Sequence, residues 1–414
     1  MMKLSRRTMI GIASLAVLAT AGCGGGASAG SGGGDKPIVL GSLLTVTNPI
    51  WQNVDVQATN KAWEKYINED LKGINGRKVQ IISCDDKGDG ATATQCANNL
   101  LAQGAVAFVN NASLAFGNVV LPQMSAKKIA SIGGNPITPQ EYQSPFVFST
   151  TPGASGSYPA LAVYFRSTGA KKLAIIHTDT AGGKGVAKQL TELWTALGGD
   201  TAESFLWDPT APDFTPLVSR VAAWKPDVVI EQASAGTAAR LFKDMDAAGM
   251  KMPIGGTSAA AVKSVFDTAG PAVEGKYFSF ACKPLSAGGD DVELYQKVMS
   301  TYAPGQELTN QTCMAASSLQ YMIHILKGIS GDVTAESVLA QLNKKEPWEG
   351  FLTHDMKADY IASTAPSLMN PWQTVSRYEG GKFVAVTVQN PDTIKNYFSE
   401  LNGIPWFRGT VAGK

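Results

Sequence analysis

The stretch Pro-Ile-Val-Leu-Gly-Ser-Leu-Leu occupies positions 37–44 and sets the pattern that most of the chain repeats. It is almost continuously apolar, as is typical of a parallel strand that is buried on both faces. An amphipathic helix is expected next, over 54–71, with Trp63 and Tyr66 near one stripe. A second strand is predicted over 78–83. The chain therefore begins with a strand–helix–strand unit.

The same alternation continues as far as Phe280. Helices and strands are predicted in turn at 91–103, 105–109, 117–126, 128–132, 146–149, 155–166 and 172–177, and three further helix–strand units follow. This alternation predicts an α/β fold with doubly wound sheets rather than one antiparallel sheet. Because crossovers between parallel strands are right-handed, the loops that follow the strands gather at one edge of each sheet, where ligands bind.

The pattern changes beyond Asp290. Helices are expected at 290–301, 310–327 and 335–342 without strands between them. Alternating apolar residues on both sides of Gly380-Gly381 then predict a β-hairpin. The composition is ordinary for a globular protein, with 44% hydrophobic and 17% charged residues and a net charge of +1. Nucleic acid and anionic surfaces are therefore not expected as partners.

The N-terminal region has the features of a removable export signal. Lys3, Arg6 and Arg7 precede an apolar run over 9–21, which is shorter than the ~20 residues of a membrane-spanning helix. The Thr-Ala-Gly that precedes Cys23 resembles the lipobox of bacterial lipoproteins, although Thr20 stands where that pattern prefers Leu. We therefore expect a signal peptide over 1–22 and a lipid on Cys23.

An ordinary secretory signal with an incidental cysteine is the alternative. The pair Arg6-Arg7 also resembles a twin-arginine signal, so the export route stays open. Residues 23–35 are rich in Gly, Ser and Ala and are expected to form a flexible tether. The rest of the chain would then work outside the cytoplasm, anchored at the cell membrane. This remaining part has no stretch of 18 uninterrupted apolar residues, so we expect it to be soluble. It exceeds the size at which a single hydrophobic core keeps growing, so we expect two lobes.

The chain contains five cysteines. If Cys23 carries a lipid, four remain in an oxidising compartment where disulfides persist, and three pairings are possible. We favour Cys84–Cys96 and Cys282–Cys313, because each pair is local and lies within one predicted structural unit. A metal site is the competing interpretation, but the three histidines are far apart and no C-x-x-C occurs.

Catalysis is not supported by the sequence. There is no G-x-S-x-G motif, and the histidines lack a neighbouring nucleophile pattern. The run Gly-Gly-Lys-Gly at 182–185 lacks the spacing of a phosphate-binding loop. The pairs Asp85-Asp86 and Asp290-Asp291 either point alternately or lie at helix starts, where they suit the helix dipole. We predict that the protein is not an enzyme and needs no cofactor.

Several stretches together carry a family resemblance. They are Ile38-Val-Leu-Gly-Ser-Leu-Leu, Val79-Gln-Ile-Ile-Ser-Cys-Asp-Asp, Pro145-Phe-Val-Phe-Ser-Thr-Thr-Pro, Lys172-Leu-Ala-Ile-Ile-His, Lys225-Pro-Asp-Val-Val-Ile, Ala272-Val-Glu-Gly-Lys-Tyr-Phe and Glu379-Gly-Gly-Lys-Phe-Val. In this order, and behind a lipoprotein-like signal, they resemble the extracellular solute-binding proteins of ABC importers. The resemblance is to the type I periplasmic-binding class, which includes branched-chain amino-acid and amide receptors, and it covers residues 37 to about 390.

The resemblance implies two lobes joined by three crossings, near Thr151, near Cys282 and near residue 353. The first lobe would comprise 36–151 and 283–352, and the second 152–282 and 353–414. A small ligand would be trapped between the lobes by hinge closure, which is favourable only if the ligand binds the closed state better. A membrane permease is the implied partner, and a monomer is expected.

The resemblance also implies a set of ligand-binding residues. In the first lobe, two loops match the positions that hold a carboxylate or carbonyl group, and their candidates are Asn111, Ala112, Ser113, Gly133 and Asn135. Each of these is also an ordinary turn residue. Trp51 and Tyr158 are candidate walls of the site, and the alternative for Trp51 is a hydrophobic staple onto the following helix.

The second lobe departs from the amino-acid receptors. It lacks their aromatic residue in the stretch 178–183, and Thr257 stands where they supply an acid for the ligand's ammonium group. The candidates here are Asp179, Ser234 and Thr257. Asp179 or Glu231 could substitute for the missing acid, and the alternative for Glu231, at a strand end, is a structural role. Because a buried ammonium without a carboxylate is costly, we expect a neutral, hydroxylated or amide-like ligand or a small acid rather than a simple α-amino acid.

Two other functions remain open from the sequence. A ligand-binding sensory module that signals to a membrane receptor or kinase would use the same fold. A structural surface lipoprotein would show no ligand-dependent closure.

Overall fold

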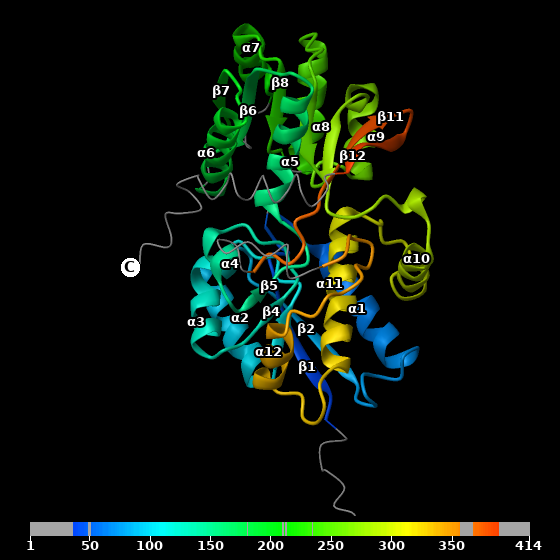
Figure 1. Cartoon of the computed structure of the whole chain (residues 1–414). Coiled ribbons are helices and arrows are strands. Elements are labelled where there is room, and N and C mark those ends of the chain that lie inside the picture. The colour runs from blue at the N-terminus through cyan, green and yellow to red at the C-terminus, as the bar shows by residue number, and fades with distance from the viewer. Residues whose placement is uncertain are drawn as a thin grey trace, which may run out of the picture. The chain divides into compact units, whose positions relative to one another are not determined.

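The computed structural model describes residues 36–48, 51–179, 181–208, 211, 213–233, 235–356 and 367–388. The first sheet has five parallel strands in the order β2-β1-β3-β4-β5 (Figure 1). They are β1 (Ile38–Leu44), β2 (Val79–Asp85), β3 (Ala107–Val109), β4 (Ser131–Ile132) and β5 (Val147–Phe148). The central strand β1 pairs Ile38 with Val79 on one side and Leu40 with Ala107 on the other.

Helices cover both faces of this first sheet. One face is covered by α1 (Val54–Glu69) and α11 (Asn310–Lys327), and the other by α2 (Gly90–Ala102) and by the π-helical turn η1 (Phe116–Val120) that continues into α3 (Leu121–Ala126). Strand β1 serves both faces, since Leu40 packs with α1 and α11 while Leu43 packs with α2 and α3. This explains why its sequence is apolar without alternation.

The second sheet has seven strands in the order β12-β11-β10-β9-β8-β6-β7. Five of them are parallel: β6 (Lys172–Thr178), β7 (Thr201–Trp207), β8 (Val228–Glu231), β9 (Ile254–Thr257) and β10 (Tyr277–Phe280). The hairpin β11 (Thr374–Glu379) and β12 (Lys382–Val388) adds two antiparallel strands at one edge. The fold is therefore α/β with two sheets of mostly parallel strands.

Helices again cover both faces. On one face lie α5 (Ala154–Ser167) and α6 (Ala181–Ala196), and on the other α7 (Thr215–Trp224), α8 (Ala235–Ala247) and α9 (Lys263–Ala269) (Figure 1). The strands supply alternate residues to the two cores: Leu173 and Ile175 face α5 and α6, while Ala174 and Ile176 face the other three helices. Four helix–strand units follow β6, where the sequence predicted three.

The chain passes between the two sheets three times in the described part. The first passage follows β5, and the second links β10 to α10 (Asp290–Tyr302). The third lies between α12 (Ala335–Asn343) and β11. Met356 and Met369 still belong to the core on the first sheet, and Ser149 forms a parallel bridge with Leu368. Leu368 itself packs in the core on the second sheet, so the chain contacts both cores at 368–369. The expected crossing near residue 353 stays a prediction.

Both predicted disulfides are present, as Cys84–Cys96 and Cys282–Cys313. The hairpin around Gly380-Gly381 is confirmed, and α11 has the bounds predicted for it. The predicted strand over 128–132 is shorter, since only β4 pairs. The signal peptide over 1–22, the lipidation site Cys23, the tether over 23–35 and the candidate Ser234 lie outside the described residues.

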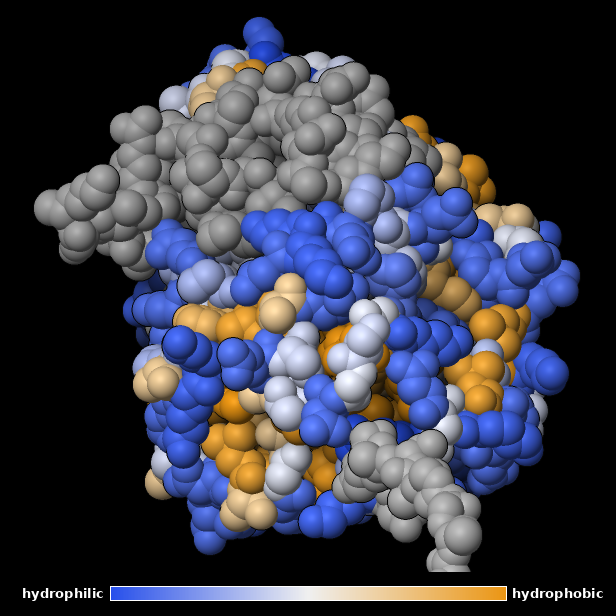
Figure 2. Space-filling view, turned by 60° about the horizontal axis from the view of Figure 1, so that its bottom comes forward, coloured by the Kyte–Doolittle hydropathy of each residue, from blue (hydrophilic) through white to orange (hydrophobic). Residues whose placement is uncertain are grey.

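The surface is mainly hydrophilic with scattered apolar areas, as Figure 2 shows for one face. Among the described residues, the exposed large apolar side chains are Val54, Leu206 and Val384, which are 55%, 48% and 46% exposed. Within the same part of the chain, no helix combines the length and the apolar character needed to cross a bilayer.

Candidate functional site

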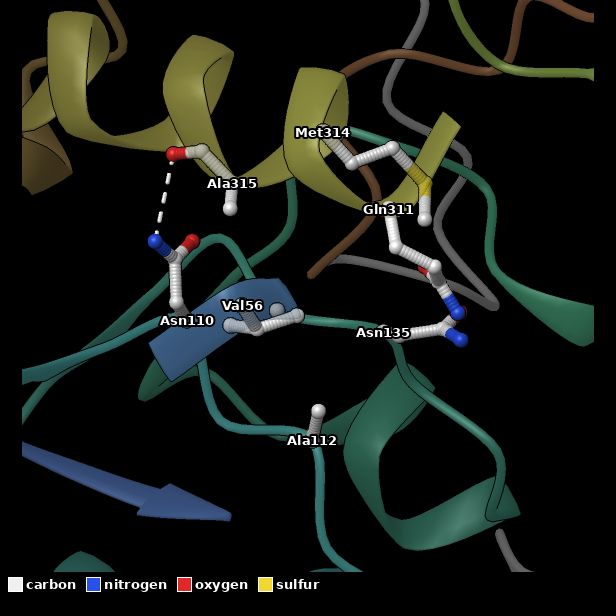
Figure 3. Close-up of a pocket in the computed structure, with 8 residues that line it drawn as sticks. Val56, Asn110, Ala112, Asn135, Gln311, Met314 and Ala315 are labelled. Atoms are coloured by element: carbon white, nitrogen blue, oxygen red, sulfur yellow. Dashed lines mark hydrogen bonds between the residues drawn. The ribbon is translucent and has the colours of Figure 1, made fainter. Parts of the chain in front are cut away.

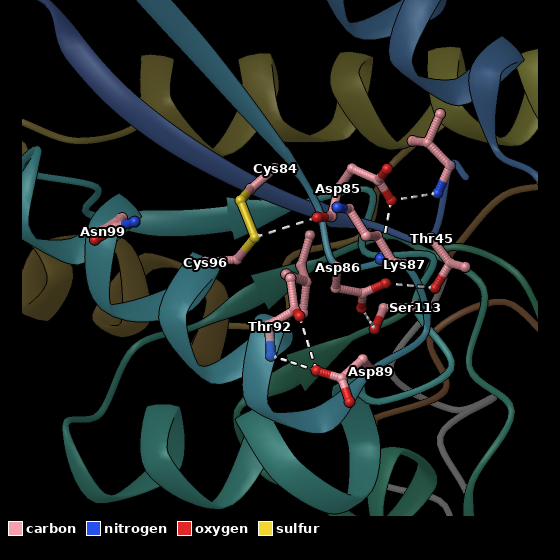
Figure 4. The surroundings of a disulfide bond; sticks show 12 residues. Thr45, Cys84, Asp85, Asp86, Lys87, Asp89, Thr92, Cys96, Asn99 and Ser113 are labelled. Carbon is pink, nitrogen blue, oxygen red and sulfur yellow. Dashed lines mark hydrogen bonds between the residues drawn. A yellow bond between two sulfur atoms is a disulfide. The ribbon is translucent and has the colours of Figure 1, made fainter. Parts of the chain in front are cut away.

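The loops after β1, β2 and β3 are tied together by a buried carboxylate. Asp86 accepts hydrogen bonds from Thr45 Oγ1 at 2.7 Å, from the Gly88 amide at 2.8 Å and from Ser113 Oγ (Figure 4). The disulfide Cys84–Cys96 joins the end of β2 to α2 beside this cluster. The Ser113 hydroxyl, a predicted ligand contact, is directed to Asp86 and is 2% exposed, so in this conformation it braces the loop.

Asn111 is likewise occupied by the fold. Its Oδ1 accepts from the Leu43 amide at 2.9 Å, and its Nδ2 donates to Ser131 Oγ at 2.8 Å. The side chain therefore links β1, β3 and β4 at their carboxyl ends. Its neighbour Asn110 donates to Asn60 Oδ1 at 2.8 Å and to the Ala315 carbonyl at 3.1 Å, and so fastens the same loop to α1 and α11.

Gly133 and Gly134 follow β4 with φ of +69° and +90°. A Cβ at 133 would overlap the side chain of Ser318 on α11, and one at 134 would lie 2.5 Å from the Asn111 carbonyl oxygen. Both positions thus need glycine for its left-handed backbone and for the close approach of neighbouring atoms. They allow the loop to fold back over the carboxyl ends of β3 and β4.

A small pocket opens where these loops meet the first turns of α11 (Figure 3). Among the described residues, its lining is uncharged and comprises Val56, Asn110, Ala112, Gly134, Asn135, Gln311, Met314 and Ala315. The Asn135 and Gln311 side chains approach each other across its rim in Figure 3. The predicted residues Ala112 and Asn135 are therefore part of this pocket, together with Asn110, Gln311 and Met314, which were not predicted.

Trp51 lies next to this pocket. It is partly buried against a small apolar cluster that contains Val56, Ala112 and Ala315, three residues of the pocket lining. The position is compatible with both of the expected roles, a wall for a ligand and an anchor for the start of α1.

The carboxyl edge of the second sheet carries a second polar cluster. The Tyr158 hydroxyl on α5 forms a hydrogen bond with the Thr257 side chain at the end of β9. Burial of the phenol raises the pKa of Tyr158, and the nearby Glu231 at the end of β8 raises it further. The structure thus brings together the predicted residues Tyr158 and Thr257 with Glu231.

Glu231 is 1% exposed, and its carboxyl group is only partly satisfied. Oε2 accepts from the Ala233 amide, whereas Oε1 has no hydrogen-bond partner among the described residues. A Cβ at position 256 would overlap Oε1, so Gly256 provides the space that this oxygen occupies. Burial raises the pKa of Glu231 to about 8, which means that the carboxyl group is mostly protonated at neutral pH.

We expect the Glu231→Gln substitution to change how stability depends on pH. Between the usual glutamate pKa of about 4.5 and a pKa of about 8, folded Glu231 keeps a proton that the unfolded chain has lost. Wild-type stability therefore falls as pH rises through this window, by as much as ~5 kcal/mol in total. Glutamine does not titrate, so the unfolding temperature of the variant relative to wild type should rise from pH 5 to pH 8.

Calorimetry at several pH values measures this difference directly. Burial also raises the pKa of Glu141, to about 7, but this group is present in both proteins and cancels. A pH-independent difference between the two proteins would mean that Glu231 has an ordinary pKa.

Among the described residues, the candidate Asp179 pairs with a lysine rather than with this cluster. Asp179 follows β6 with a 69% exposed side chain and forms an ion pair with Lys184 at the start of α6. Ser234 is not among the described residues. Asp179 therefore lies on the surface as a solvated ion pair in this conformation.

Asn310 connects the edges of the two sheets. As the first residue of α11, it precedes Gln311 of the pocket lining. Its Oδ1 accepts from the amides of Ala281 and Cys282 in the second passage, at 3.1 and 3.3 Å, and its Nδ2 donates to Ser258 Oγ after β9 at 2.9 Å. Asn310 and Ser258 thus form a short chain of direct contacts between the pocket and the cluster of Tyr158, Thr257 and Glu231.

Comparison with known proteins identifies the family. The model of the periplasmic binding protein family matches residues 37–367. The chain belongs to this family. Its members are binding receptors rather than enzymes and work outside the cytoplasm, so a general solute-binding role follows.

The individual relatives have low sequence identity to this chain. The Leu/Ile/Val-binding protein homolog 1 of Brucella suis biovar 1 (strain 1330) is 25% identical over 340 residues, which cover 80% of this chain and 89% of that protein. A fatty acid ABC transporter substrate-binding protein from Thermomonospora curvata has a TM-score of 0.74 at 19% identity, covering 87% of this chain and 94% of that one. A solute-binding protein from R. palustris, solved in complex with benzoate, has a TM-score of 0.72 at 18% identity. The match covers 85% of this chain and 96% of that one. The two structural matches show a shared fold.

Proposed function

We propose that this protein is the extracytoplasmic solute-binding component of an ABC importer. It captures a small polar organic molecule between its two lobes and delivers it to a membrane permease. The observation that carries the proposal is the position of the two polar clusters. The pocket at the carboxyl edge of the first sheet and the Tyr158–Thr257–Glu231 cluster at that of the second are linked through Asn310 and Ser258. A ligand in contact with both would favour closure.

The chemistry of the pocket supports a ligand with a carboxylate or amide end. The lining offers side-chain amides from Asn110, Asn135 and Gln311 and apolar contacts from Val56 and Met314, without a charged group. Amides can donate to a carboxylate or pair with another amide. The named ligands of the relatives, which include benzoate and a fatty acid, also combine an acid group with an apolar body. We therefore retain small acids and amides as the ligand class.

A thermal-shift screen of the purified protein tests this function. The panel contains small aliphatic and aromatic acids, amides, urea, polyols and amino acids. A ligand at a hundred times its dissociation constant stabilises the folded state by about 2.7 kcal/mol, which gives a measurable shift. We expect a shift with an acid or an amide. A shift with leucine would contradict this ligand class. It would indicate that the Glu231 carboxyl group pairs with the ammonium group of the ligand. If no compound shifts the unfolding temperature, the result would contradict a carrier function for these compounds and would favour a sensory or structural role.

The Asn135→Ala substitution should weaken the binding of any compound identified in the screen. Loss of one amide contact to a ligand costs about 1–3 kcal/mol, which corresponds to an affinity weaker by about 5- to 150-fold. Isothermal titration calorimetry measures the change. Asn98→Ala on the exposed face of α2 is the matched control and should bind normally. Equal affinities for the two variants would mean that the Asn135 side chain does not contribute to ligand binding.

We further propose that a lipid on Cys23 anchors the protein to the cell membrane. The small residues before Cys23 and the Gly/Ser-rich segment after it support this anchor. Fractionation of cells that express Cys23→Ser tests the proposal, because the variant should leave the membrane fraction. If it stays there as wild type does, the anchor lies elsewhere.

A further inference from the structure

A second and larger cavity lies beside the Cys282–Cys313 disulfide. Its volume is about 460 Å³, which is within the range of 300–1,000 Å³ that small-molecule sites occupy. Most of its lining is apolar and includes Phe280, Leu285, Tyr295, Leu308, Phe383 and Val384. Three aromatic rings in one cavity of this size favour an occupant with an apolar body.

The wall of this cavity comes from three parts of the fold. Strand β10 and the β11–β12 hairpin contribute Phe280 and Phe383 from the second sheet, and α10 contributes Tyr295, which packs in the core of the first sheet. Between them runs the second passage, represented by Cys282 and Leu285. An occupant would therefore touch both halves of the protein and the segment that joins them.

The cavity is separate from the pocket described above. The first turns of α11 stand between them, with Gln311, Met314 and Ala315 lining the pocket and Asn310 and Cys313 lining the cavity. No residue belongs to both linings. The cavity is therefore not a continuation of the proposed solute site.

The charge of the lining is one-sided. Among the described residues, the lining contains Lys283 and Lys382 and no aspartate or glutamate. Lys283 pairs with Asp291 outside the cavity, at 2.7 Å. Lys382 at the start of β12 is exposed and forms no ion pair within the described part of the chain. A cationic group at the mouth of an apolar cavity complements an anion with an apolar body.

From this arrangement we propose that the cavity binds an amphipathic organic anion, a carboxylate or sulfonate whose apolar part lies among Phe280, Leu308 and Phe383 and whose acid group meets Lys382. Apolar burial supplies most of the affinity, and the ammonium group selects the anion over its neutral analogue.

The test uses the full chain and a fluorescent probe of this class, 1-anilinonaphthalene-8-sulfonate, with decanoate and decanol as competitors. Wild type should bind the probe saturably, and decanoate should displace it at least fivefold more effectively than decanol. Lys382→Glu should weaken probe binding at least fivefold. Ala261→Phe, which places a ring in the cavity, should weaken it at least tenfold.

Two controls distinguish this site from other apolar surfaces. Lys61→Glu makes the same change of charge on the exposed face of α1 and should leave the affinity unchanged. Asn135→Ala alters only the pocket and should also bind the probe normally. Equal probe affinity in wild type, Lys382→Glu and Ala261→Phe would overturn the proposal, as would absence of saturable binding. Equal displacement by decanol and decanoate would overturn the role of Lys382.

Discussion

Replacing Gly133 by alanine is expected to destabilise the protein by about 2–5 kcal/mol. A non-glycine residue in the left-handed region costs about 1–2 kcal/mol, and the φ of Gly133 is +69°. The new Cβ would also overlap the side chain of Ser318, and overpacking of a core adds about 1–3 kcal/mol. Ser318 has little freedom to move, because it is 1% exposed and hydrogen-bonded to Thr150 at 2.8 Å and to the Met314 carbonyl at 2.9 Å.

Urea unfolding of the variant and of a matched control separates the two contributions. Gly104 has a φ of +89°, and a Cβ there would meet no atom within 4 Å. Gly104→Ala should therefore show the backbone cost alone, about 1–2 kcal/mol. Equal losses in the two variants would show that the loop at 133 relaxes away from α11 without cost. A larger loss at 133 would confirm that this loop and α11 are held in one rigid arrangement beneath the pocket.

Removal of the Cys282–Cys313 disulfide is the second large effect. The Cys282→Ser/Cys313→Ser variant should lose about 3–4 kcal/mol, because the bond closes a loop with a sequence separation of 31 and so restricts the unfolded chain. We expect its unfolding temperature to fall by about 5 °C. Both cysteines also pack in the core on the first sheet, so their replacement by serine removes apolar contacts as well.

Differential scanning calorimetry with and without a reductant checks this expectation. Reduction should destabilise wild type by the contributions of both disulfides and should affect the variant only through Cys84–Cys96. That bond spans 12 residues and should contribute about 3 kcal/mol. An unchanged unfolding temperature in the variant would mean that the second passage is held equally well by the hydrogen bonds from the Ala281 and Cys282 amides to Asn310.

Local sequence patterns were sufficient for the elements of the fold. The apolar stretch at 37–44 became β1, and the segment 310–327 became α11, which begins at a Thr309 capping box. Two alternating runs around Gly380-Gly381 became β11 and β12. Each of these is indicated by a pattern of residues close in sequence. The shortened β4 was not predicted, because strand pairing across the chain sets its limits.

The candidate site was predictable only in part. The sequence located the loops after β3 and β4, and Ala112 and Asn135 do line the pocket. Gln311 and Met314 also line the pocket, but they come from α11, which is far in sequence from the loops after β3 and β4. The one sequence feature that could have indicated them is the side-chain amide of Gln311 near the start of a buried helix. The side chains of Asn111 and Ser113 were expected to face a ligand, but in this conformation they hydrogen-bond to Ser131 and Asp86.

What the sequence alone determined is the α/β class, the order of most elements, the two disulfides and the family resemblance. Periodicity, turn residues and cysteine spacing act over short distances, so they can be recognised without coordinates. The tertiary structure decided which polar atoms remain free to bind. Among the described residues, it left Oε1 of Glu231 without a hydrogen-bond partner beside Gly256 and placed the exposed Lys382 in the lining of an apolar cavity. The reason is that hydrogen-bond satisfaction and cavity shape depend on neighbours that only the folded chain brings together.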